Sequence, residues 1–136
     1  MNVLLALAAG GAVSVAFGFL WHLPFVFGSQ WLSLMGWTEA THPKPSVVRM
    51  TLSIIGEFLI GALTSLALWF FFVVAAVPTL QFAIVLAVYL WVGFILTTLV
   101  SSAIWERTPW ELFVINALFR LISLMLIAVV LSVILI

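Results

Sequence analysis

Glu57 and Arg120 are two side chains of opposite charge that lie deep inside apolar stretches of the sequence. Each stretch is long enough to span a bilayer, where an ionised side chain at the centre of a helix costs roughly 2.5–3.5 kcal/mol on insertion scales. Two opposite charges in such places predict a partnership inside a helix bundle. A protonatable carboxyl group beside a permanent guanidinium charge is suited to gating a pocket or to holding an anionic headgroup.

The two charges are expected at the same depth. Glu57 lies about 11 residues into its stretch and Arg120 about 11 into its own, so both should lie roughly 16 Å below the face where these helices begin. This match predicts a direct ion pair near the bilayer midplane. The pair would either fix the register of the helices or form part of a binding or transport site, and a third reading turns either charge toward another subunit.

Four further polar residues extend this candidate site. Ser53 lies one helical turn from Glu57, Asn116 lies one turn from Arg120, and Thr97 and His22 lie closer to the loops on their own helices. Polar groups thus concentrate in the half of the bundle nearer the charged loops. This asymmetry predicts a half-cavity open to that face, because a continuous pore needs polar lining along its whole length. The competing interpretation is that small and polar residues merely let the helices pack.

Signs of metal binding and enzyme chemistry are weak. His22 and His42 form no recognised ligand motif, so neither a metal nor another cofactor is expected. The chain contains no cysteine and no aspartate, and its serines lie in no recognised nucleophile motif. A membrane enzyme that acts on a lipid-like substrate is therefore the weakest of the functional hypotheses.

The composition determines which elements must position these residues. The chain has 136 residues, of which 67% are hydrophobic and 6% charged, whereas a soluble domain carries about 25% charged residues. Apolar stretches at about 3–24, 47–72, 80–103 and 110–135 are each long enough for a transmembrane helix. The prediction is an all-α bundle of four transmembrane helices in a single domain, residues 1–136. The net charge of zero offers no field for nucleic acid.

The connections between these helices predict the orientation in the membrane. Residues 25–46 form the longest connection, in which Ser29 is expected to cap a short helix, SQWLSLMGW. Lys44, Arg49 and Arg107 all fall on the face that carries this loop, and the face with the two termini has no Lys or Arg. The positive-inside rule then predicts a cytoplasmic loop face and both termini outside, in the inner or plasma membrane.

Two motifs carry a family resemblance. FGFLWHLPFVFGSQWLSLMGW resembles the opening signature of the bacterial family called domain of unknown function 1761, in which a Gly-x-x-Trp element is followed by Pro, Phe-Gly-x-x-Trp and Gly. The segment LWVGFILTTLVSSAIWERTPWELFVINALFRLISL is similar to that family's Trp-x-Gly-Phe third helix, glutamate-arginine turn and Asn-containing fourth helix. His22 stands where the family pattern has Tyr. The resemblance implies a small four-helix membrane protein and no established activity.

The remaining hypotheses concern assembly and partners. Gly-Phe pairs at 18–19 and 93–94 each precede a tryptophan at a similar distance, which would fit a repeat of two helix pairs. Small residues left over after packing favour a homo-oligomer. The leading functional hypothesis is a binding or transport protein whose partner is membrane lipid or a small amphiphilic or anionic ligand. The rival is a structural or accessory subunit whose charges serve only assembly.

Overall fold

The computed structural model describes residues 2–38 and 40–135, and all of its regular secondary structure is helical. Helix α1 spans Val3–Trp21 and is followed by a π-helical turn η1, Pro24–Gly28, and a short helix α2, Ser29–Leu34. Helix α3 spans Val47–Ala75. The next long helix is continuous from α4, Leu80–Leu90, through a π-helical segment η2, Trp91–Leu96, to α5, Thr97–Glu106; α6 spans Trp110–Leu135.

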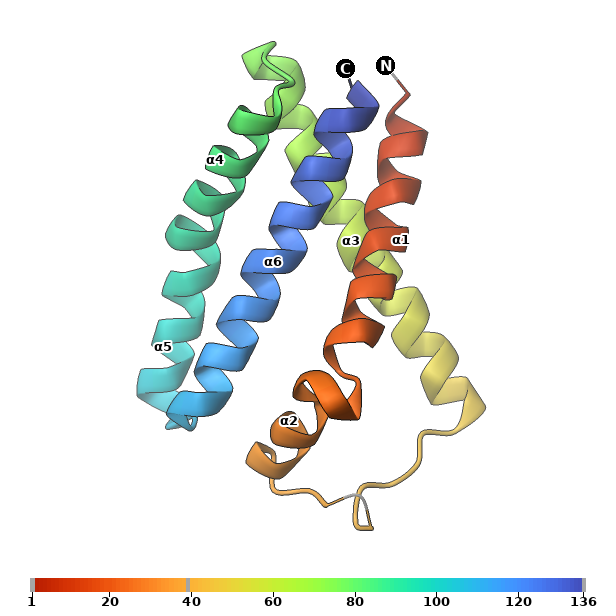
Figure 1. Ribbon diagram of the computed structural model, residues 1–136, viewed down its shortest axis with the longest axis vertical. Helices are drawn as coiled ribbons and strands as arrows, with labels where there is room; N and C mark the ends of the chain where they lie inside the picture. Colours follow the sequence, from red (N-terminus) through yellow and green to blue (C-terminus); the bar gives the residue numbers. More distant parts are fainter. Residues whose placement is uncertain (1, 39, 136) are drawn as a thin grey trace.

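Four of these helices are long and apolar enough to cross a membrane: Val3–Trp21, Val47–Ala75, Leu80–Glu106 and Trp110–Leu135. The predicted all-α architecture with four spans is confirmed, and the chain is a multi-pass membrane protein. Both termini lie at one end of the bundle, and the 25–46 connection and the α5–α6 turn lie at the other (Figure 1). We call these the terminal end and the loop end.

The first span ends earlier than the sequence analysis predicted, because the chain folds back on itself at the loop end. Pro24 begins η1, and a Cβ on Gly28 would overlap the carbonyl oxygen of His22, so glycine permits this close return. Ser29 does not cap α2 as predicted. Its hydroxyl donates to the carbonyl oxygen of Pro24 at 2.8 Å, and the chain runs directly from η1 into α2 with helical dihedral angles.

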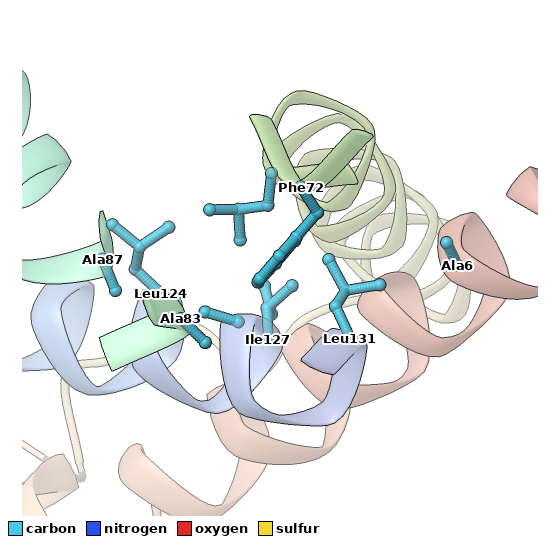
Figure 2. Packing of buried hydrophobic residues seen from close by; sticks show 9 residues of the cluster. Ala6, Phe72, Ala83, Ala87, Leu124, Ile127 and Leu131 are labelled. Atoms are coloured by element: carbon cyan, nitrogen blue, oxygen red, sulfur yellow. The ribbon is translucent and has the colours of Figure 1, made fainter. Parts of the chain in front are cut away.

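The apolar core lies toward the terminal end. Phe72 of α3 packs there with residues of α1, α4 and α6, as Figure 2 shows. The buried members of this cluster are Ala6, Leu68, Phe72, Ala83, Ala87, Leu124, Ile127, Ala128 and Leu131. Alanines on α1, α4 and α6 allow the helices to approach closely where bulkier residues would hold them apart. The terminal half of the bundle is therefore tightly packed.

The loop half of the bundle is more open. Helices α3 and α6 diverge toward the loop end, and in Figure 1 α1 and α2 lie between their ends. A second, aromatic cluster fills part of this space, with Trp21 stacked on Phe27 at 4.3 Å between ring centroids and Phe17 stacked on Phe119 at 5.4 Å. This cluster joins α1 and η1 to α6. Helix α3 takes no part in it and contacts chiefly α1.

Candidate functional site: a polar pocket at the loop end

The crossing of α1 and α3 forms one wall of the site and has almost no space between the two backbones. A Cβ on Gly10 would overlap Ser65, and a Cβ on Gly61 would overlap both Ser14 and the Gly10 carbonyl. The Ser65 hydroxyl, fully buried, donates to the carbonyl oxygen of Ala6 at 2.6 Å. Small residues four apart on each helix thus bring α1 and α3 into direct backbone contact.

Glu57 extends the same stripe of α3 by one turn toward the loop end. Its Oε1 accepts a hydrogen bond of 2.6 Å from the hydroxyl of Ser14, a residue that is only 2% exposed. The second oxygen, Oε2, has no hydrogen-bond partner among the described residues. Gly18 leaves room beside the carboxylate, since a Cβ there would stand 3.7 Å from Glu57 Cγ. Glu57 is therefore held at one oxygen and available at the other.

Arg120 lies on α6 with its Cζ 5.3 Å from the centroid of the Phe119 ring. This position favours a cation–π interaction, which for a partly exposed pair is worth about 0.5–1 kcal/mol. The Arg120 side chain is exposed, and within residues 2–38 and 40–135 it makes no hydrogen bond or ion pair. Among the described residues, the Phe119 ring is the one group that interacts with this cation.

The predicted ion pair between Glu57 and Arg120 is therefore wrong: no buried ion pair occurs in the described part of the chain. Equal depth in the membrane determines the position of two residues along the bundle axis, but it does not determine which neighbouring helix each side chain faces. Glu57 turns toward α1, where Ser14 binds it, while α3 and α6 separate toward the loop end (Figure 1). Both charges nevertheless line the same space.

That space is a pocket of about 640 Å³ bounded by α1, α3, α6, the α2 region and one residue of α5. Its polar lining residues are His22, Ser53, Glu57, Asn116 and Arg120. Five of the six predicted site residues are thus brought together around one cavity. The sixth, Thr97, is not part of the lining; its hydroxyl donates to the carbonyl oxygens of Gly93 and Phe94 on its own helix.

The polar lining residues differ in whether their side chains form hydrogen bonds within the protein. His22 Nδ1 lies 2.8 Å from the carbonyl oxygen of Gly18, and Ser53 donates to the carbonyl oxygen of Arg49 at 2.9 Å, so each is tied to its own neighbourhood. The Asn116 amide makes no side-chain hydrogen bond with a described residue. Asn116 and Arg120 are one turn apart on α6, so the two side chains present several N–H donors on one face of that helix.

The apolar part of the lining was not anticipated from the sequence. Phe19, Met35, Met50, Ile54 and Leu99 form much of the pocket wall, and two of these come from the 25–46 connection and the first turn of α3. Ser14 was not among the predicted site residues, although its spacing from Gly10 and Gly18 places it on the face that meets Glu57. A search for a hydroxyl on that face would have found the partner of Glu57.

Comparison with curated proteins and with solved structures gives no match to this chain. The profile described as "Protein of unknown function (DUF1761)" matches residues 5–132, which include most of α1, every residue that lines the pocket and most of α6. The match covers nearly the whole chain and confirms the resemblance carried by the two motifs. The protein belongs to the DUF1761 family.

Proposed function

We propose that this protein is a binding or transport protein that takes a small amphiphilic ligand in the pocket at the loop end. The observation that supports this proposal is the gathering of Glu57, Arg120 and Asn116 around one cavity of about 640 Å³ in which their remaining hydrogen-bonding groups have no partner among the described residues. Ligand pockets have volumes of about 300–1,000 Å³, with apolar walls and a few polar groups that fix orientation. Charged groups at membrane depth are costly without such a role.

The position of the pocket supports access from one side. The tightly packed apolar cluster occupies the terminal end, whereas the pocket lies at the loop end. We infer a half-cavity that is closed toward the terminal end and reached from the loop end, which Lys44, Arg49 and Arg107 mark as the cytoplasmic side. A transport cycle would require a second conformation that opens the terminal half.

Filling the pocket tests this function directly. The Leu99→Trp variant introduces an indole into the lining from α5, and the matched control Val100→Trp places the same ring at the adjacent exposed position outside the lining. Full-length protein is purified in a mild neutral detergent and examined by native mass spectrometry for a bound amphiphile. We expect a bound species in the wild type and in Val100→Trp, and its loss in Leu99→Trp and in Arg120→Leu.

Two outcomes would contradict the proposal. A wild-type protein that carries no amphiphile and binds none on addition would favour the structural or accessory role, in which the charges serve assembly. A ligand that persists equally in Leu99→Trp and Val100→Trp would show that amphiphiles bind elsewhere on the apolar surface.

A further inference from the structure

We infer that the ligand of this pocket is a zwitterionic amphiphile, with a cationic group at Glu57, an anionic group at Arg120 and an apolar tail. This inference rests on the proposed function and specifies its ligand. Two observations carry it: the pocket holds one negative and one positive side chain that do not pair with each other, and the rest of its wall is largely apolar.

The separation of the two charges distinguishes a zwitterion from a singly charged ligand. If Glu57 and Arg120 were paired, each would neutralise the other and the pocket would favour a neutral molecule. Instead, Glu57 and Arg120 both line the cavity, and neither Glu57 Oε2 nor the Arg120 guanidinium has a hydrogen-bond partner among the described residues. An anion alone would leave the partly buried carboxylate without a counter-charge, and a cation alone would leave the guanidinium without one.

The hydrogen-bonding groups that remain free on Glu57 and Arg120 indicate which part of the ligand each one binds. Ser14 donates to Glu57 Oε1, which leaves Oε2 as the oxygen that can accept from an ammonium group. Arg120 presents a planar fork of N–H donors, and Asn116 adds an amide one turn away. Guanidinium and amide donors together suit the oxygens of a phosphate or carboxylate group.

The apolar wall indicates where the tail lies. Met50 and Ile54 of α3 and Leu99 of α5 belong to the lining, yet α3 and α5 make little or no contact with each other along their described lengths. A chain that leaves the charged groups can run between these two helices to the acyl region of the bilayer. Methionine side chains such as Met35 and Met50 adapt readily to tails of different shape.

Three probes with the same tail and different head groups test this inference. Dodecylphosphoethanolamine is zwitterionic, dodecyl phosphate is anionic and dodecylamine is cationic. Binding of each to the full-length protein in nanodiscs of neutral composition is measured by competition against a fluorescent amphiphile, with Leu99→Trp as the control for binding outside the pocket. We expect dodecylphosphoethanolamine to bind about tenfold or more tightly than either singly charged probe, since one charge-assisted contact is worth at least that factor.

Variants that remove one charge should change which of the three probes binds most tightly. Glu57→Gln is expected to weaken dodecylphosphoethanolamine about tenfold while leaving dodecyl phosphate bound as well as before or better, and Arg120→Leu is expected to weaken it while sparing dodecylamine. If dodecyl phosphate binds the wild type as tightly as the zwitterion and Glu57→Gln changes neither, the inference fails and an anion-binding pocket remains. If no probe is sensitive to Leu99→Trp, the proposed function fails as well.

Discussion

At the residue scale, Glu57 and Arg120 are each stabilised by a different neighbour and do not pair with each other. Glu57 is satisfied at one oxygen by a buried hydroxyl, and Arg120 by the face of an aromatic ring. Both interactions are partial, because each leaves unused hydrogen-bonding groups on a residue that lines the pocket. A hydroxyl donor costs little to bury compared with a second charge, which explains how Ser14 can support Glu57 inside a close helix crossing.

Removing that hydroxyl should destabilise the protein. Ser14→Ala keeps the small side chain required at the crossing with Gly61 and deletes only the donor to Glu57, so we expect a loss of about 1–2 kcal/mol in the free energy of unfolding. The measurement is unfolding by SDS titration of the purified protein. The control is Ser53→Ala, whose hydroxyl donates only to the backbone of its own helix and which should cost less than about 0.5 kcal/mol.

A double-mutant cycle locates the partner of Glu57. Ser14→Ala combined with Glu57→Gln should show a coupling energy of about 1 kcal/mol, and this should exceed the coupling between Arg120→Leu and Glu57→Gln. A larger coupling to Arg120 than to Ser14 would restore the ion pair that sequence depth alone predicted.

At the element scale, glycines decide how closely helices approach. Gly61 lies where α3 meets Ser14 and the backbone of Gly10, whereas Gly56, on the same helix, has no neighbouring atom within 4 Å of its would-be Cβ. Both are glycines in the interior of one helix, so they carry the same backbone cost relative to alanine. They differ only in what surrounds them.

This contrast makes opposite predictions for the same substitution. Gly61→Ala should destabilise the protein by about 1–3 kcal/mol, because the overlap involves backbone and a buried Cβ that cannot move without separating α1 from α3. Gly56→Ala should stabilise it by about 0.5–1 kcal/mol through helix propensity. Unfolding in SDS checks both. Equal effects of the two changes would mean that α1 and α3 do not meet at this crossing.

The helices also show which features of the fold and the site could be predicted from the sequence. Helix number, the extents of all four spans to within about three residues and the polar character of the loop half follow from hydropathy and spacing, and five predicted site residues line one pocket. Which helix each polar face meets does not follow. The sequence paired Glu57 with Arg120 on the last helix, and only the crossing of α1 and α3 selects Ser14. The two-helix repeat, the oligomeric state and the role of the site residues stay predictions.

At the scale of the whole molecule, the bundle is divided into a packed half and an open half. The apolar cluster around Phe72 joins α1, α3, α4 and α6 at the terminal end, while the pocket and the diverging helices lie at the loop end (Figures 1 and 2). A bundle built in this way can hold a ligand on one side without a continuous path across the membrane. The side that faces the cytoplasm therefore determines from which compartment the pocket is reached.

The orientation can be measured because the chain contains no cysteine. Ala40→Cys places a thiol in the 25–46 connection, and Val77→Cys places one in the α3–α4 turn at the opposite end; both positions are exposed. Lys44, Arg49 and Arg107 flank the loop end, so we expect the loop end to be cytoplasmic. A membrane-impermeant maleimide should then label Ala40→Cys in inside-out bacterial vesicles and Val77→Cys in right-side-out vesicles. The reverse pattern would place the pocket on the outer side, whereas labelling of both positions in both preparations would mean that three cations are too few to fix one orientation.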